Sequence, residues 1–189
     1  YTSGDATCDH LMSRTPHRRI FLLGTPALAG AFQERGFELA GVGEDADAVV
    51  AAFDKTLAYD RLSHACTLLL RGADYFATHP DATCITPDGL IPDVGAIVAA
   101  IQTATGRSPF VVGKPEAPIV TAALERLGTP AERTLLVGDQ LDTDMTMAAR
   151  AGLFAVLALS GETSEAQARA FDPTPDLIVS GVGELAARL

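Results

Sequence analysis

The chain has 189 residues, enough for one large domain or two small ones, and a chain of this size buries roughly 70% of its unfolded surface without disulfide or metal cross-links. Apolar residues make up 48% and charged residues 20% of the chain, which excludes a disordered protein. The formal net charge of −10 disfavours nucleic acid and membrane surfaces as partners, and no apolar run approaches the ~20 residues that a membrane helix needs.

The cysteines and histidines argue against cross-links and zinc motifs. Cys8, Cys66 and Cys84 form no CxxC pair and are odd in number, which indicates reduced thiols and a cytoplasmic location. The four histidines show no HxxxH or HExxH spacing, so the sequence argues against a zinc site. The chain opens on Tyr1-Thr2-Ser3-Gly4, which is no natural initiator, and we expect that the sequence begins inside a longer protein.

Short apolar runs alternate with stretches of helical periodicity along most of the chain. After a first helix near the N-terminus, the pattern predicts strands at 20–23, 37–42, 48–53 and 75–77, and helices at 27–35 and 60–71. After a turn at 86–89, it predicts helices at 94–105, 117–127, 143–151 and 182–189, and strands at 110–112, 134–137, 153–159 and 177–179. This alternation is typical of βαβ units and a parallel sheet.

Two loops stand out as candidate sites of chemistry. Residues 112–116 and 137–144 each directly follow an apolar strand, and one helix and one strand lie between them. We therefore expect one right-handed crossover, with both loops at the carboxyl edge of one sheet. Ligands bind at that edge in open α/β sheets.

The residue types in these loops suit anion chemistry assisted by a metal. Asp139 offers hard carboxylate oxygens of the kind that Mg²⁺ prefers, and Asp144 could hold a metal-bound water or a second coordination point. Lys114 supplies a point charge for a phosphoryl oxygen or a nucleophilic carboxylate. Gly113 and Gly138 allow the backbone to approach a ligand closely.

A structural interpretation of the same residues stays open. Acids just before a helix are often caps or partners of the helix dipole, and Asp142, Thr143 and Asp144 fit that description. A lone lysine at the end of a strand is usually solvated. Asp142 is the weaker candidate for a metal ligand on either interpretation.

The two loops resemble known motifs. Gly113-Lys114-Pro115, followed by the run from Glu132 to Asp144 that ends in GDQLDTD, resembles the third and fourth motifs of haloacid dehalogenase (HAD) superfamily phosphatases. The resemblance is greatest to the NagD-like branch, which includes 4-nitrophenylphosphatase-like, phosphoglycolate and pyridoxal phosphate phosphatases. It extends over almost the whole chain, through the stretches at 77–81, 87–90 and 175–176.

This resemblance implies a fold and a domain division. The fold is α/β, with a Rossmann-like HAD core, here a partial parallel sheet, and an α/β cap domain of the C2 type. Residues 1–105 correspond to the cap and residues 106–189 to the C-terminal half of the core, with an approximate boundary between them.

The resemblance also implies a mechanism for small phosphate monoesters. In the family, an aspartate attacks the phosphate to form an aspartyl-phosphate, a second aspartate protonates the leaving group, and Mg²⁺ bridges nucleophile and phosphoryl group. Asp139 then corresponds to a Mg²⁺ ligand, Asp144 supports the water shell of the metal, and Lys114 is a catalytic residue that steadies nucleophile and phosphate. Gly113 and His79 correspond to weaker candidates for substrate contacts, with a turn residue before Pro80 as the alternative role of His79.

The family's first two motifs do not occur where they should. A D-x-D motif after an opening strand and a Ser/Thr at the end of another strand are both missing before residue 19. Phe53-Asp54-Lys55-Thr56 mimics the first motif, but Thr56 stands where the acid/base aspartate belongs. We therefore expect that this chain contains no nucleophile, that the catalytic opening segment is missing, and that the chain alone has little or no activity.

Other classes of protein remain possible on the sequence. A non-catalytic HAD-like binding or interaction protein is the main alternative to the phosphatase. A phosphorylation-receiver domain also uses acids and a lysine at strand ends, but in the reverse order along the chain. Because relatives often dimerise through the cap, a homodimer through the cap is a further expectation, and the expected ligand is a small phosphorylated metabolite.

Overall fold

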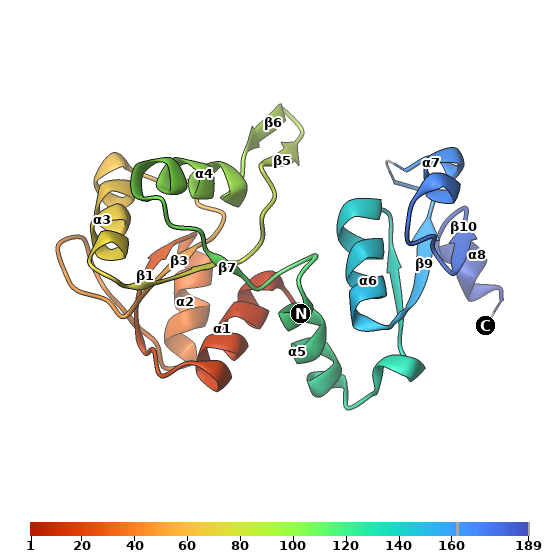
Figure 1. Cartoon of the computed structure of the whole chain (residues 1–189), viewed down its shortest axis with the longest axis horizontal. Helices are drawn as coiled ribbons and strands as arrows, with labels where there is room; N and C mark the ends of the chain where they lie inside the picture. The colour runs from red at the N-terminus through yellow and green to blue at the C-terminus, as the bar shows by residue number, and fades with distance from the viewer. Residues whose placement is uncertain (162, 189) are drawn as a thin grey trace. The chain divides into compact units, whose positions relative to one another are not determined.

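The computed structural model describes residues 1–161 and 163–188, and the chain divides into two compact units (Figure 1). The first unit runs from Tyr1 to Gly113 and the second begins at Lys114. Both units are of mixed α/β type and each contains a parallel sheet, which confirms the predicted fold class. Among the helices of these residues, none is both long and apolar enough to cross a membrane.

The first unit is built on a five-stranded sheet in which all neighbouring strands are parallel. The strand order is β2-β1-β3-β4-β7. The strands are β1 (Arg19–Leu23), β2 (Glu38–Leu39), β3 (Ala48–Ala51), β4 (Asp74–Ala77) and β7 (Phe110–Val111), and the helices are α1 (Ser3–Arg14), α2 (Pro26–Glu34), α3 (Tyr59–Leu70) and α4 (Val94–Thr105). Every residue of β3 is buried, which is typical of a parallel strand covered on both faces.

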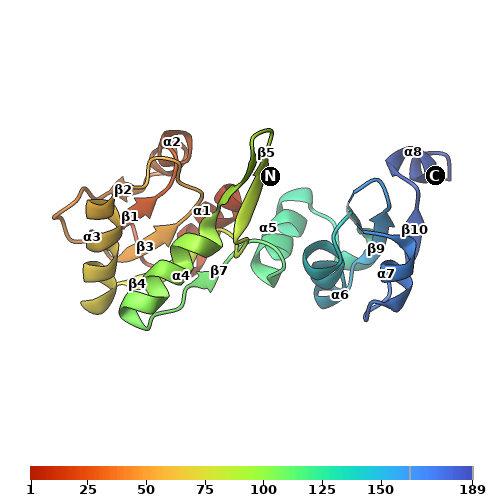
Figure 2. The ribbon, with the colours of Figure 1, turned by 90° about the horizontal axis from the view of Figure 1, so that it is seen from above.

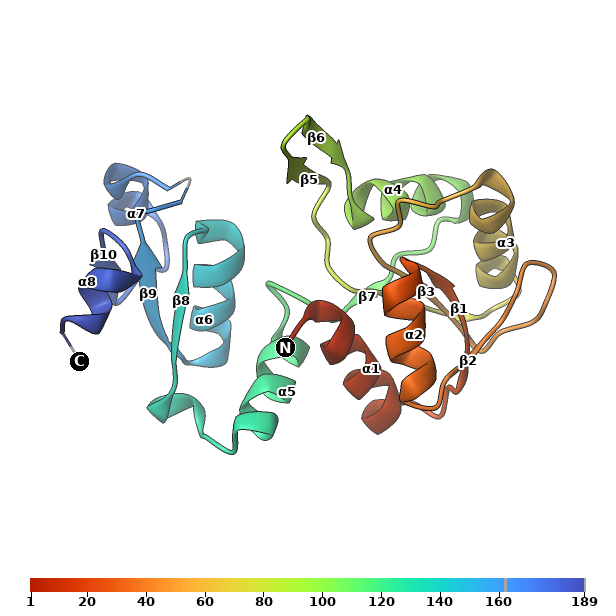
Figure 3. The same cartoon turned by 180° about the vertical axis from the view of Figure 1, so that it is seen from behind.

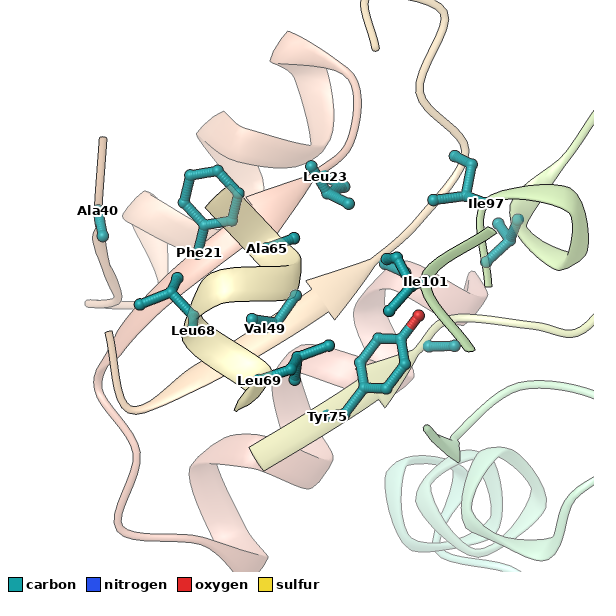
Figure 4. Close-up of a cluster of buried hydrophobic side chains, with 13 residues drawn as sticks. Phe21, Leu23, Ala40, Val49, Ala65, Leu68, Leu69, Tyr75, Ile97 and Ile101 are labelled. Carbon is teal, nitrogen blue, oxygen red and sulfur yellow. The ribbon is translucent and has the colours of Figure 1, made fainter. Parts of the chain in front are cut away.

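Helices cover both faces of this sheet. Alternate strand residues, among them Phe21, Val49 and Tyr75, pack against α3 and α4 in one buried cluster (Figure 4). The two helices lie side by side on that face (Figure 2). On the opposite face, α1 and α2 lie together (Figure 3), and each contributes a fully buried side chain, Leu11 and Phe32. Polar chemistry in this unit is therefore confined to the edges of the sheet and the loops.

A capping box fixes the start of α1. The Thr2 side chain accepts a hydrogen bond from the backbone N–H of Asp5, and the Asp5 carboxylate accepts one from the backbone N–H of Thr2. The same carboxylate pairs with Arg35, which follows α2. Capping and ion pairing together tie α1 to the neighbouring helix of the first unit.

A hairpin outside the main sheet lies between β4 and α4. β5 (Thr83–Thr86) pairs with β6 (Gly89–Pro92) in antiparallel fashion, where the sequence pattern predicts only a turn. Gly89 adopts a φ of 117°, which glycine does without steric cost. The hairpin brings its two ends together, because the backbone N–H of Asp93 donates to the carbonyl of Ala82 over 3.0 Å.

The second unit contains a three-stranded parallel sheet with the order β10-β9-β8. Its strands are β8 (Leu135–Gly138), β9 (Phe154–Ala158) and β10 (Leu177–Val179). Its helices are α5 (Ala117–Leu127), α6 (Thr146–Ala151), α7 (Glu165–Ala170) and α8 (Val182–Ala186), with a 3₁₀ turn at Ala131–Arg133 and a π-helical turn at Leu141–Met145. The six-residue helix α7 was not predicted, because it is too short for hydrophobic periodicity to reveal it.

The two faces of this second sheet are covered unequally. On one face, residues of α5, α6 and α7 pack against β9 in a buried cluster. On the other face, Leu185 of α8 packs against β9 and β10. Leu135, Val137 and Phe154 on that second face are exposed, and β8 is an edge strand among the described residues.

One step of the topological prediction was wrong. β7 pairs with β4 in the first sheet, whereas β8 pairs with β9 in the second, so the two candidate loops do not close one crossover in a single sheet. The same pairing carries the first unit through Gly113, beyond the approximate boundary at 105 that the sequence predicts. Aromatic contacts help to hold β7 there, because Phe110 stacks on His10 of α1 and meets Phe76 of β4 edge to face.

Candidate active site in the second unit

An ion pair joins the two candidate loops, although they do not share a sheet. The Lys114 ammonium donates a hydrogen bond to Oδ1 of Asp144 over 2.8 Å. The Lys114 side chain is 47% exposed and that of Asp144 only 8%, so a solvated cation meets a buried carboxylate. An ammonium has three N–H donors, and Lys114 can therefore hold Asp144 and contact an anionic ligand at the same time.

Asp144 also holds the loop that carries Asp139. Its Oδ2 accepts hydrogen bonds from the backbone N–H groups of Asp139, over 3.2 Å, and of Gln140, over 3.3 Å. Gly138 leaves room for this arrangement, since a Cβ at that position would lie 2.3 Å from the Cβ of Asp144. The Asp144 side chain thus fills the space at Gly138 that the sequence suggested for a ligand.

The π-helical turn before α6 sets the position of Asp144. The backbone N–H groups of Asp144 and Met145 both donate to the carbonyl of Gln140 over 3.2 Å. Such turns are rare and occur frequently at functional sites. Neither the π-helical turn nor α6 has a side-chain cap, so the alternative in which Asp142 or Asp144 serves as a helix cap does not describe this structure.

The Asp139 carboxylate is held in place through its backbone. The backbone N–H of Asp139 donates to Asp144, and the backbone carbonyl of Asp139 accepts a hydrogen bond from Thr163 Oγ1 over 2.7 Å. The loop after β9 passes directly over the carboxylate, because a Cβ on Gly161 would lie 2.0 Å from Asp139 Oδ2. Within the described residues no group donates to the carboxylate itself, so its oxygens stay available to a ligand.

The other predicted residues of these loops have different surroundings. Asp142 is exposed, and Thr143 donates its hydroxyl to the side-chain oxygen of Gln140 over 2.9 Å. Gly113 lies in the first unit, where a Cβ would meet the carbonyl oxygen of Thr78 at 2.0 Å. Close packing of the backbone is therefore sufficient to require glycine at position 113.

Asp54 has a structural role in the first unit. Its side chain is fully buried and pairs with Arg61 over 2.7 Å, while Thr56 donates both its N–H and its hydroxyl to the other carboxylate oxygen. Arg61 also donates to the carbonyl of Leu22 in β1. Because these partners occupy both oxygens, Asp54 is poorly placed to attack a substrate.

His79 belongs to a cluster of polar side chains that the sequence did not reveal. It follows β4 and lies 3.2 Å from Asp93, the N-cap of α4, with Nε2 facing Oδ1. Asp81 completes the cluster, in which one potential ligand atom from each side chain lies within 4.8 Å of the others. Two of these residues are separated by the hairpin, so no local spacing could have found the group.

Comparisons with known proteins agree with this architecture. Residues 111–185 match the HAD-hydrolase-like family. The chain is 34% identical over 185 residues to ribonucleotide monophosphatase NagD of Escherichia coli, and 31% identical over 186 residues to dihydroxyacetone phosphatase of Corynebacterium glutamicum. Each match covers 98% of this chain, and 72% and 67% of the respective relative.

Solved structures show the same similarity in three dimensions. The crystal structure of 4-nitrophenylphosphatase from Thermotoga maritima superposes with a TM-score of 0.91 at 43% identity, over 99% of this chain and 71% of that one. The chain therefore belongs to the NagD-like phosphatases of the HAD superfamily. It spans about two thirds to three quarters of the length of these relatives.

Proposed function

We propose that the protein of which this chain forms part is a Mg²⁺-dependent hydrolase of small phosphate monoesters that works through an aspartyl-phosphate. The observation that carries this proposal is the connected set of Lys114, Asp144 and Asp139 at the end of β8. It combines a solvated ammonium, a buried carboxylate and a carboxylate whose oxygens have no hydrogen-bond donor among the described residues.

The donor set fits Mg²⁺. Asp139 supplies hard oxygen, and its carboxylate lies in a cradle that a side chain at position 161 would fill. Mg²⁺ usually keeps several waters and binds proteins through one or two carboxylates, so Asp139 would be a direct ligand and Asp144 would support the surrounding waters. When bound, the ion would neutralise negative charge on the phosphoryl group.

Lys114 and Asp144 have separate roles in this proposal. Asp144 anchors Lys114 through Oδ1 and the Asp139 loop through Oδ2, so it fixes the distance between the cation and the metal ligand. Lys114 would contact the phosphoryl oxygens and stabilise charge that develops during transfer, because its ammonium is preorganised by the ion pair. Gly113 and His79 stay weaker candidates for substrate contacts.

Asp54 is a poor candidate for the nucleophile. Asp54 is neutralised by Arg61, and we propose that residues outside these 189 supply the attacking aspartate, so that this chain alone is inactive. The cytoplasmic location that we propose is supported by the sequence, in which Cys8, Cys66 and Cys84 are odd in number and form no CxxC pair. A homodimer through the first unit remains part of the proposal, and light scattering in solution would test it.

Small phosphorylated metabolites are the substrate class that the relatives support. Two relatives are named ribonucleotide monophosphatase and dihydroxyacetone phosphatase, and both names describe phosphatases of small molecules. A surface of net charge −10 suits a small anion bound at a locally positive point such as Lys114 better than an extended polyanion.

The decisive experiment measures hydrolysis of 4-nitrophenyl phosphate by the full-length product of the native gene, with and without Mg²⁺. We expect Asp139→Asn to lower kcat/KM by at least about a hundredfold, the scale on which preorganised charge stabilisation acts. Asp142→Asn is the matched control and should leave activity within about twofold, because Asp142 is exposed. Full activity of Asp139→Asn would overturn the proposed role of Asp139 as a metal ligand. No activity of the native product with any phosphate ester would favour the non-catalytic binding protein instead.

A further inference from the structure

A second group of potential metal ligands lies in the first unit, apart from Lys114 and Asp139. His79 and Asp81 belong to the loop after β4, and Asp93 directly precedes α4. One imidazole nitrogen and two carboxylate oxygens approach one another to within 4.8 Å. All three residues belong to the first unit, so the cluster forms independently of the second.

The closest pair already has the separation that a metal ion requires. His79 Nε2 and Asp93 Oδ1 are 3.2 Å apart. Two ligands of a tetrahedral zinc ion, each bound at about 2.0–2.1 Å, lie about 3.3 Å apart. Asp81 is exposed, so a change of its side-chain rotamer can bring its carboxylate to the third position.

The charge of the cluster points to a cation. Asp93 is only 7% exposed, yet its partners among the described residues are the His79 ring and the backbone N–H of Val94. Neither Asp93 nor Asp81 pairs with a lysine or arginine within the described part of the chain. Buried carboxylates in proteins are paired with a positive group or coordinate a metal, and here no permanently charged side chain supplies that pairing.

Backbone hydrogen bonds join the two segments that carry Asp81 and Asp93. The N–H of Gly95 donates to the carbonyl of Asp81 over 2.8 Å, and the N–H of Asp93 donates to the carbonyl of Ala82 over 3.0 Å. Gly95 lets the two segments touch, because a Cβ there would lie 2.3 Å from the carbonyl oxygen of Pro80. The backbone of the site is therefore already in place, and metal binding requires only a change in the side chain of Asp81.

We propose that His79, Asp81 and Asp93 form a binding site for a divalent transition metal such as Zn²⁺. The three side chains provide one nitrogen and two oxygen ligands, and solvent completes the coordination. Imidazole favours Zn²⁺ and related ions over Mg²⁺, which prefers an all-oxygen environment. The sequence spacing that argues against zinc applies to local motifs, whereas this site is assembled across a hairpin.

The first unit also contains a natural control for this site. His17 lies 2.7 Å from Asp74 in a second histidine–aspartate pair. The described residues provide no third ligand there that completes a cluster, and only the group at His79 has three potential ligands. If a histidine–aspartate pair alone were sufficient, metal would bind at both His17 and His79. If the third ligand is required, metal will bind only at His79.

The test is a Zn²⁺ titration of the metal-free 189-residue chain carrying Asp139→Asn, which removes the expected metal ligand of the second unit. Isothermal titration calorimetry gives the stoichiometry and Kd, and nitrogen NMR of the histidine side chains identifies the ring that responds. We expect one high-affinity equivalent and a change at the His79 ring. His79→Gln and Asp81→Asn should each raise Kd by at least about tenfold, since loss of an outer partner of a ligand already costs that much.

Two ligand variants are used so that the test stands even if one of them fails to fold. Asp81 is exposed and its side chain makes no hydrogen bond among the described residues, so Asp81→Asn should leave the fold unchanged in circular dichroism. His17→Gln should retain the Kd of the parent chain. Absence of saturable binding, a response only at His17 or at the thiols, or unchanged affinity in both His79→Gln and Asp81→Asn would overturn the proposal. None of these outcomes bears on phosphate hydrolysis, which is tested separately at Asp139.

Discussion

Asp54 and Asp139 occupy equivalent places in the two units, since each follows an apolar strand of a parallel sheet. In the first unit, Arg61 and Thr56 surround a fully buried Asp54 carboxylate. In the second unit, the backbone of Asp139 makes the hydrogen bonds, and its half-buried carboxylate receives none within the described residues. The same residue type in the same kind of position therefore stabilises one unit and is left available for a ligand in the other.

The difference lies in what the surrounding chain provides. Arg61 reaches Asp54 from α3, seven residues further along the chain, and satisfies its charge locally. At the second site, Lys114 pairs with Asp144, and no cationic side chain of the described residues pairs with Asp139. The charge of Asp54 is therefore paired within the fold and serves stability, whereas the Asp139 carboxylate is held in place with its oxygens available and is a candidate for binding and catalysis.

The largest expected effect is on the stability of the first unit. Asp54→Ala leaves the Arg61 guanidinium, three quarters buried, without its carboxylate, and should lower the free energy of unfolding by about 3 kcal/mol. The matched change Asp139→Ala should alter it by less than about 0.5 kcal/mol, because the backbone of Asp139 makes its contacts. Hydrogen exchange of the β3 and β8 amides during urea titration reports each unit separately. Equal destabilisation by the two substitutions would remove the distinction between paired and free acids.

A smaller effect is expected from the loop that covers Asp139. Gly161→Ala places a methyl group against the Asp139 carboxylate and should displace it, which we expect to weaken Mg²⁺ binding by about tenfold. Gly183→Ala is a suitable control, because no atom lies within 4 Å of a Cβ at that position. Calorimetric titration with Mg²⁺ of the native gene product carrying either substitution would measure the two affinities. Unchanged affinity in Gly161→Ala would show that this glycine does not shape the metal site.

The smallest expected effect concerns pH and another paired acid, Asp5. The backbone N–H of Thr2, followed by the side chains of Thr2 and Arg35, lowers the pKa of Asp5 below its usual value of 3.8. The resulting stabilisation, below about 1 kcal/mol, should be fully present above about pH 4 and be lost as pH falls through the lowered pKa. The free energy of unfolding of the parent and of Asp5→Asn, measured at pH 6 and in stronger acid, checks this prediction. The difference in stability between the two proteins should become smaller in acid. A difference in stability that does not depend on pH would contradict the prediction.

Much of the secondary structure could be predicted from local patterns. The helix at 117–127 has the predicted bounds, because its apolar spacing is clear and Gly128 ends it in the left-handed conformation. The strand at 37–42 was predicted too long, since only Glu38–Leu39 pairs with β1. Local propensity identifies an extended segment, but the neighbouring strand decides how much of it enters the sheet.

The candidate site was predictable only in part. The sequence indicated Lys114, Asp139 and Asp144, because charged residues directly after apolar strands are unusual enough to notice. It gave no sign that Asp144 binds both of the others, since that contact depends on a π-helical turn and on the space at Gly138. Nor did it indicate Asp93, which looks like an ordinary helix cap until the hairpin places it beside His79.

By itself the sequence determined the α/β class, most helices and strands, and the residues of the HAD-like loops, because each of these depends on neighbours a few positions apart. The tertiary structure decided which sheet each strand joins, which aspartate is neutralised and which stays free, and which side chains gather at His79. These outcomes depend on contacts between residues far apart in the chain, where burial and charge compensation select among arrangements that the local pattern leaves equally open.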